Sequence, residues 1–294
     1  MSEEWDGVIG KLEQLLDRVD GLLEVNTPSA APDAALFERY SAFRWERGKG
    51  GGKFLPVEHP HLVDLADLVG IDYAREELVR NTAQFVAGYS ANNVLLWGER
   101  GTGKSSCVKG LLRIFAAKGL RLVEVQRGDL LSLPLIVGQI RRLPQRFIVF
   151  CDDLSFAEGD ASYQELKALL DGGIEARPTN LLIYATSNRR HLMPERMADN
   201  LDAEIHPEEA LSDKLSLADR FGLALSFYPF NQETYLAIVE HYAAQSNLPL
   251  AGEELRKQAL QWALYKGQRS GRAARQFVDD LAGRLRMEQQ AKNS

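Results

Sequence analysis

The sequence predicts an α/β protein built on a five-stranded parallel sheet, with an N-terminal helical extension and a C-terminal all-helical domain. Five short runs rich in Val, Ile, Leu or Phe alternate with helical sequence between residues 93 and 228. A glycine-rich loop at residues 98–105 separates the first run from a helix. After Pro229 the pattern changes to helices only. Runs that are apolar on both faces and joined by helices are typical of a parallel sheet covered on both sides.

The composition is that of an ordinary globular protein. The chain has 294 residues, of which 45% are hydrophobic and 26% are charged, enough for one large or two modest domains. Its net charge of −6 argues against a general nucleic-acid coat or a membrane-surface binder, although a local basic site is compatible with it. The sequence has no apolar run of membrane-spanning length and no signal-peptide pattern, so we expect a cytoplasmic protein without a membrane partner. Cys107 and Cys151 are expected to be buried, inert thiols.

Residues 1–53 are expected to form the N-terminal helical region. Between residues 1 and 24 apolar side chains recur at alternating spacings of three and four, which is a heptad-like seam. This helix either packs on its own domain or docks a partner or a second copy. The second helix of the region is capped by Asp33 and carries Leu36, Phe37, Tyr40 and Phe43. The glycine-rich residues 48–53 have no strand before them, and we expect a flexible hinge at the boundary with the next domain.

Residues 54–229 are expected to form the α/β core, and residues 230–294 the small helical domain. Within the core, residues 65–87 read as a turn followed by a helix. Residues 192–216 carry many acids and are expected to be an insertion or loop with one helix. The five expected strands are residues 93–97, 120–125, 146–151, 181–186 and 223–228. In the C-terminal domain Asn231 caps one helix, a second spans about residues 253–265, and Ser270 caps a third.

The loop that follows the first strand fits the pattern G-x-x-x-x-G-K-[ST] and precedes a helix, which is the context that a phosphate-binding loop requires. Glycines let successive backbone N–H groups point at phosphate oxygens, and the helix adds its positive dipole end. Lys104 is expected to reach the β and γ phosphates and Ser105 to ligate magnesium. The sequence therefore predicts binding of a nucleoside triphosphate. The residues expected to line its phosphates are Gly98, Glu99, Arg100, Gly101, Thr102, Gly103, Lys104, Ser105 and Ser106.

The third apolar run ends in the paired carboxylates Asp152 and Asp153. Magnesium bound at a phosphate-binding loop must also be held from the side opposite Ser105, and an acid at the end of a neighbouring strand reaches that side. We therefore assign Asp152 to Mg²⁺, directly or through its water shell. Asp153 would polarise the attacking water.

With these motifs in place, the chain resembles an AAA+ ATPase. Ala185-Thr186-Ser187-Asn188 resembles sensor 1 of that superfamily, which implies that Asn188 orients the water near the γ phosphate. Ala218-Asp219-Arg220-Phe221-Gly222 resembles the arginine-finger box, which implies that Arg220 acts on a neighbouring subunit. Residues 270–275 resemble sensor 2, with Arg272 as first choice and Arg275 as second. The segment that resembles the adenine-packing segment is Asp67-Leu68-Val69-Gly70-Ile71.

The likeness extends to bacterial ATP-binding proteins catalogued as family 815 of the domains of unknown function. It runs from about residue 43 to the C-terminus and is carried by residues 97–106, 150–156, 184–192 and 219–222. The resemblance implies ATP and Mg²⁺ as cofactors, a helical lid at residues 230–294, and ATP-dependent homo-oligomers.

One residue departs from the superfamily pattern, because AAA+ enzymes usually place Glu where this chain has Asp153. The shorter side chain holds its carboxylate about an ångström further from the water, and such a displacement can cost on the order of a hundredfold in rate. We therefore expect tight ATP binding with slow basal hydrolysis.

Two functions stay open at this point. The first is an ATPase that remodels an unidentified protein partner, which could dock through the N-terminal helix. The second is an ATP-gated scaffold or loader with little hydrolysis. A nucleic-acid-associated loader is supported only by the Arg/Lys excess of residues 256–286, which solvated lid faces also explain. A small-molecule kinase fits poorly, because no acceptor site is recognisable.

Overall fold

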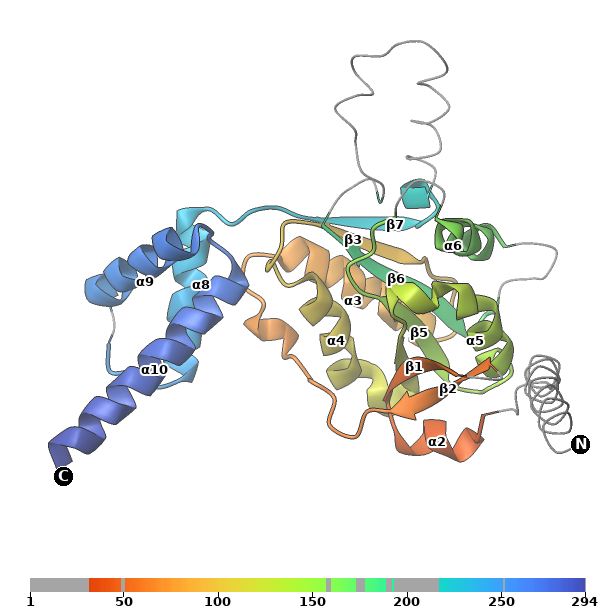
Figure 1. Cartoon of the computed structure of the whole chain (residues 1–294), viewed down its shortest axis with the longest axis horizontal. Helices are drawn as coiled ribbons and strands as arrows, with labels where there is room; N and C mark the ends of the chain where they lie inside the picture. The colour runs from red at the N-terminus through yellow and green to blue at the C-terminus, as the bar shows by residue number, and fades with distance from the viewer. Residues whose placement is uncertain are drawn as a thin grey trace, which may run out of the picture.

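The computed structural model describes residues 32–48, 51–156, 160–172, 178–188, 192, 217–250 and 252–293. The expected helix at residues 1–24 and nearly all of the acidic segment 192–216 lie outside the described residues. The centre of the molecule is one seven-stranded sheet with the strand order β2-β1-β4-β5-β6-β3-β7 (Figure 1). The strands are β1 (Ala42–Gly48), β2 (Gly51–Pro56), β3 (Val94–Gly98), β4 (Leu120–Glu124), β5 (Arg146–Cys151), β6 (Leu181–Ser187) and β7 (Leu223–Phe227).

The five predicted strands are confirmed as β3 to β7, and they form a continuous parallel block. The sheet is larger than predicted, however, because β1 pairs in parallel with β4 and β2 pairs antiparallel with β1. The side chains of β1 alternate, since Phe43 and Trp45 are buried whereas Arg44 and Glu46 are exposed. Alternating burial of this kind is typical of a strand that has one face on the core and the other toward solvent.

Two predictions for residues 33–53 are therefore wrong in part. Asp33 does cap helix α2 (Ala34–Arg39), but the helix ends before Tyr40, and Phe43 lies in β1. The described residues of the glycine-rich segment belong to the paired strands β1 and β2 and not to a hinge, with Gly48 opposite Gly51. The expected boundary at residue 53 falls inside β2, and we propose instead that the α/β core begins near residue 34.

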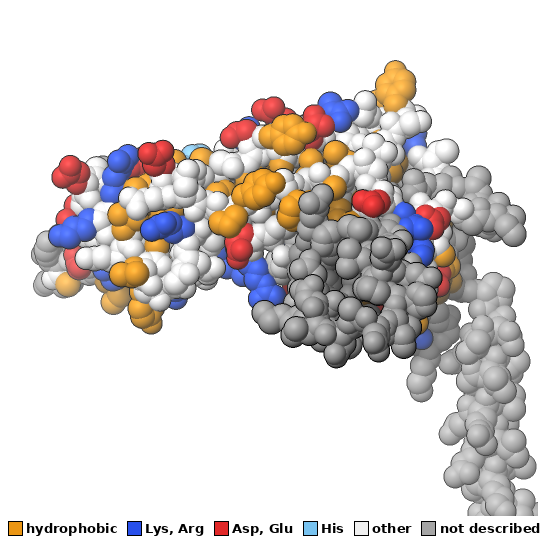
Figure 2. Space-filling view, turned by 90° about the horizontal axis from the view of Figure 1, so that it is seen from above, with side chains coloured by type: hydrophobic (Ala, Val, Ile, Leu, Met, Phe, Trp, Pro, Cys, Tyr) orange, Lys and Arg blue, Asp and Glu red, His pale blue; other side chains and the backbone are white. Residues whose placement is uncertain are grey.

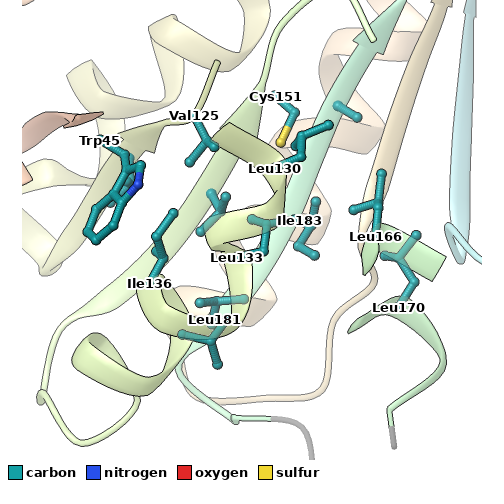
Figure 3. Packing of buried hydrophobic residues seen from close by; sticks show 14 of the residues in the cluster. Trp45, Val125, Leu130, Leu133, Ile136, Cys151, Leu166, Leu170, Leu181 and Ile183 are labelled. Atoms are coloured by element: carbon teal, nitrogen blue, oxygen red, sulfur yellow. The ribbon is translucent and has the colours of Figure 1, made fainter. Parts of the chain in front are cut away.

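Helices cover both faces of the sheet. The core helices are α3 (Asp72–Val86), α4 (Lys104–Phe115), α5 (Leu133–Ile140) and α6 (Ala161–Asp171), with short 3₁₀ turns η1 (Leu65–Asp67), η2 (Ala116–Lys118) and η3 (Arg127–Ser132). Successive residues of β5 point to opposite faces, so Val149 packs against α5 and α6 in one cluster and Ile148 against α3 and α4 in the other. Figure 3 shows part of the first cluster, with Leu133 and Ile136 of α5 on the same face of the sheet as Ile183 and Leu181 of β6.

The three helices after the sheet are confirmed as α8 (Gln232–Gln245), α9 (Gly252–Lys266) and α10 (Gly271–Asn293). Asn231 caps α8 by accepting a hydrogen bond from the N–H of Thr234, and the Ser270 hydroxyl accepts one from the N–H of Ala273. They enclose a hydrophobic cluster of their own, and they lie beside the core in Figure 1. We keep residues 230–294 as the proposed lid.

Among the helices that the structure describes, none combines the length and the apolar character needed to cross a membrane.

Cys107 and Cys151 are buried and free, and burial raises the pKa of each thiol to about 12. The expected burial of both cysteines is thus confirmed. A thiol with so high a pKa stays protonated at neutral pH, as an inert thiol would.

A buried arginine ties α2 to the sheet. The Arg121 guanidinium donates to the backbone carbonyls of Phe37, Ala116 and Leu120. Burial lowers its pKa. We expect Arg121→Met to lower the free energy of unfolding by about 1–3 kcal/mol, because buried carbonyls lose their charged donor. Urea unfolding measures this, with Arg44→Met as control, since Arg44 is exposed and forms only a surface pair with Glu124. Equal effects of the two substitutions would contradict a structural role for Arg121.

Candidate nucleotide-binding site

A cavity of about 840 Å³ lies where the core meets the proposed lid. Its walls are the loop between β3 and α4, the residues that follow β5, the end of β6, the segment around η1, and the lid helices α8 and α10. The carboxyl ends of parallel strands meet at one edge of a sheet, which is where such folds bind ligands. A cavity of this size accommodates a nucleotide.

The loop before α4 has a backbone that requires glycine. Gly98 has φ 133°, and a Cβ there would lie 1.9 Å from the carbonyl oxygen of Phe227. This close approach allows the N–H of Glu99 to donate to the same carbonyl at 2.9 Å. The loop is thereby fastened to β7. Residues Arg100 to Ser106 line the cavity, whereas Gly98 and Glu99 lie behind it.

Lys104 is the first residue of α4, and its amine is turned into the loop. Its Nζ donates to the carbonyls of Gly98 at 2.8 Å and Glu99 at 2.7 Å, and it lies 3.3 Å from Oδ1 of Asn188. The residue is 7% exposed. Burial lowers the pKa of Lys104, while nearby Asp153, Glu99 and Asp152 act in the opposite direction. A buried ammonium held by neutral carbonyls is suited to bind phosphate oxygens.

Asp152 and Ser105, the two residues predicted to hold magnesium, are in direct contact. Oδ1 of Asp152 accepts a hydrogen bond from the Ser105 hydroxyl at 2.6 Å. A hydroxyl and a carboxylate from two elements are the oxygen ligands that Mg²⁺ prefers, and this ion usually takes its remaining ligands from water and phosphates. No cluster of three or more His, Cys, Asp or Glu side chains in the described ranges could hold a metal ion without such help. The residues therefore fit Mg²⁺ bound together with a nucleotide.

Asp153 lies beside Asn188 and has an unusual backbone. Its φ is 53°, in the left-handed region that Asp and Asn adopt more readily than other non-glycine residues. The Asn188 amide donates to Oδ1 of Asp153. Because the Asn188 oxygen also accepts from Lys104, one side chain connects the predicted phosphate ligand to the predicted water-polarising acid.

Leu68 and Val69 line the cavity, and Gly70 lies directly behind them. Gly70 has φ 84°, and a Cβ there would lie 2.4 Å from the Thr234 side chain of α8. Asp67 accepts hydrogen bonds from His241, at 3.0 Å, and from Gln245, both also on α8. The segment predicted to pack against adenine is thus held against the lid.

The two sensor 2 candidates, Arg272 and Arg275, both line the cavity but have different surroundings. The N–H of Arg272 donates to the Gly101 carbonyl at 3.3 Å, which places it directly against the phosphate-binding loop. Arg275 is paired with Asp279, at 3.1 Å, and its guanidinium lies 5.0 Å from the centre of the Tyr242 ring. These contacts of Arg275 are both with residues of the lid helices.

Arg220 is not among the residues that line the cavity, and unlike Gly70, Gly98 and Glu99 it does not lie close to a lining residue in the sequence. It follows the short helical turn before β7, and its Nε donates to Asp171 at the end of α6. Within one chain it is separate from Lys104 and Asp153.

Sequence reasoning missed two parts of the cavity lining, which are Thr186 and the apolar wall formed by Phe230, Ile238 and Tyr242. Thr186 lies in the segment that resembles sensor 1, but no pattern in the neighbouring sequence indicates that its hydroxyl belongs to the site. The wall residues lie in the lid, and the apolar periodicity of α8 alone does not distinguish side chains that face the cavity from those that face the lid core.

The fold and site together define the class of protein. A phosphate-binding loop follows β3, paired acids follow β5, β3 lies between β6 and β7, and the C-terminal helices α8 and α10 contribute to the cavity wall. This is a P-loop protein with the AAA+ fold. The chain belongs to the family described as "Protein of unknown function (DUF815)", whose family model matches residues 38–285.

Comparison with other proteins gives more distant similarities. The chain is 27% identical over 126 residues to "Chaperone protein ClpB" of Rickettsia bellii (strain RML369-C) and of Rickettsia felis (strain ATCC VR-1525 / URRWXCal2). The matched region is 37% of this chain but spans only 14% of the length of each relative.

Among solved structures, it is similar to the Thermotoga maritima RuvB Holliday junction branch migration motor, with 14% identity and a TM-score of 0.44 over 76% of this chain and 72% of that one. A point mutant of that protein gives 12% identity and a TM-score of 0.46 over 74% and 71%.

Proposed function

We propose that this protein binds ATP with Mg²⁺ and hydrolyses it, and that hydrolysis is coupled to oligomerisation and to the remodelling or loading of a partner. The observation that carries the proposal is the convergence of Lys104, Ser105, Asp152, Asp153 and Asn188 on one cavity. These residues come from separate elements of the fold, and each has the chemistry that its proposed role needs.

The roles follow from the geometry. The Lys104 ammonium binds the β and γ phosphates in place of the carbonyls that it now contacts. Mg²⁺, held by Ser105 and Asp152, would neutralise phosphate charge. Asp153 accepts a proton from the attacking water, and Asn188, already hydrogen-bonded to Asp153, orients that water.

We assign sensor 2 to Arg272 and a supporting role to Arg275. Arg272 lies in the first turn of α10, against the phosphate-binding loop, whereas the Arg275 guanidinium contacts the Tyr242 ring in the cavity wall. Arg272 would therefore contact phosphate, whereas Arg275 would support the wall that faces the base.

We further propose that Arg220 acts on the nucleotide of a neighbouring subunit. In its own chain Arg220 contacts Asp171 and is not among the residues that line the cavity, which supports an action in trans. An arginine that stabilises charge on the transferring phosphate is worth about a factor of 10³ or more.

The second candidate is an ATP-gated scaffold or loader with little hydrolysis. Two features of Asp153 favour this function, namely its short side chain and its hydrogen bond to Asn188. Both would keep the carboxylate away from the attacking water and so slow hydrolysis. A nucleic-acid role gains no support, since basic and acidic side chains of the lid are interspersed on the face shown in Figure 2.

One experiment separates these alternatives. We expect the purified protein to form oligomers in ATP but not in ADP or without nucleotide, as seen by light scattering after size exclusion. We expect its steady-state turnover to stay below about one per second. Assembly with slow phosphate release supports the ATPase, and assembly without phosphate release supports the scaffold. A monomer in all three conditions, or turnover well above that limit, contradicts the proposal.

A further inference from the structure

A single buried hydroxyl contacts both acidic residues of the site. Thr186 is the penultimate residue of β6, which lies between β5 and β3, and it is 1% exposed. Its Oγ1 lies 2.5 Å from Oδ1 of Asp152 and 2.8 Å from the backbone N of Asp153. These two residues follow β5, the neighbouring strand, whose Cys151 is in register with Ala185.

The direction of both hydrogen bonds is fixed by chemistry. An amide N–H can only donate, so the Thr186 oxygen accepts from Asp153. The one hydroxyl proton is then available to Asp152, whose ionised carboxylate can only accept. The same carboxylate oxygen accepts from Ser105 at 2.6 Å. Thr186 and Ser105 therefore orient Asp152 from two sides.

The backbone of Thr186 fixes the turn that follows β5. Its carbonyl accepts from the N–H of Leu154 at 2.7 Å, while its hydroxyl accepts from the N–H of Asp153. Asp153, between these bonds, has the left-handed φ of 53°. A left-handed conformation in a non-glycine residue persists only where its surroundings hold it. Here two successive N–H groups are held by one residue.

We propose that Thr186 is a positioning residue, whose hydroxyl sets the orientation of the Asp152 carboxylate for Mg²⁺ and of Asp153 for the attacking water. This inference rests on the proposed function and deepens it. Groups that orient metal ligands in this way typically contribute 10- to 100-fold to metal affinity or activity, so a loss of about that size is expected on removing the hydroxyl.

The test compares Thr186→Val, which keeps the shape but removes the hydroxyl, with Thr186→Ser, which keeps the hydroxyl. The probe is the fluorescent ATP analogue mant-ATP, titrated with Mg²⁺, and kcat and KM are measured alongside. We expect Thr186→Val to raise the Mg²⁺ concentration for half-maximal binding by about 10-fold or more and to lower kcat. Thr186→Ser is expected to restore most of both. If Thr186→Val does not fold, Thr186→Ala is measured in its place.

The matched control is Thr82→Val. The Thr82 hydroxyl is also buried and bonded, to the Leu78 carbonyl at 2.8 Å and the Tyr184 hydroxyl at 2.9 Å, but it lies outside the cavity wall. We expect Thr82→Val to lower the thermal stability of the protein without changing the Mg²⁺ dependence of mant-ATP binding. An unchanged Mg²⁺ dependence and kcat in Thr186→Val, or the same shift in Thr82→Val, overturns the role of Thr186 alone. Wild-type protein that binds mant-ATP without any effect of Mg²⁺ overturns the proposed function as well.

Discussion

Replacing Asp153 by asparagine is expected to lower ATP turnover by about 10²- to 10⁴-fold, the usual contribution of a positioned general base. ATP binding should persist, because Lys104, Ser105 and Asp152 are unchanged. The amide cannot take a proton from water, although it can still pair with Asn188. Phosphate release measures turnover, and equilibrium binding of mant-ATP measures affinity on the same samples.

The choice of asparagine follows from the backbone at this position. Asn tolerates the left-handed φ of 53° as Asp does, so the substitution changes the chemistry and keeps the turn. Asp72→Asn is the control, since Asp72 is an exposed carboxylate at the start of α3 that pairs with Arg75. Turnover of Asp153→Asn that equals that of Asp72→Asn would remove Asp153 from the mechanism.

Arg220→Ala is expected to reduce turnover by about 10³-fold at protein concentrations where the oligomer forms. The reason is the loss of positive charge at the γ phosphate of the neighbouring subunit. Arg80→Ala is a matched control, because Arg80 is also an arginine that pairs with a carboxylate, that of Glu77, but lies on α3.

Mixing subunits distinguishes action in trans from a structural role. Asp153→Asn subunits bind ATP and retain Arg220, so they should supply the arginine to the intact site of an Arg220→Ala subunit. We expect the mixture to release phosphate faster than either variant alone. If both variants assemble but the mixture releases phosphate no faster than either variant alone, Arg220 does not act across an interface.

The features predicted correctly from sequence are those encoded by neighbouring residues. The parallel strands were visible as apolar runs, and Asn231 and Ser270 marked helix starts because a cap and its N–H lie two or three residues apart. The phosphate-binding loop and the acids after β5 were equally local. Their meeting at one edge then followed from the parallel sheet alone.

The features that were missed depend on contacts between distant segments. The β1–β2 hairpin looked like a hinge because its glycines are flexible in isolation, and Gly52 is needed only because a Cβ there would lie 2.3 Å from the Trp45 ring. Thr186 acquires its role from the register of β6 against β5. Arg272 and Arg275 could not be ranked, because the decisive neighbours are Gly101 in the loop and Tyr242 in another helix.

The contact between the phosphate-binding loop and the lid is made largely by main chain. The Gly101 carbonyl accepts from the N–H of Arg272, a Cβ on Gly101 would lie 2.9 Å from the Ser270 hydroxyl, and one on Gly271 would lie 3.2 Å from the Gly101 oxygen. A rearrangement of the loop around phosphates would thus displace the start of α10 directly, through the Arg272 N–H and through the close packing of Gly101 against Ser270 and Gly271. Because Gly101 and Gly271 have no side chain to truncate, replacing either glycine with a larger residue is the substitution that tests this contact.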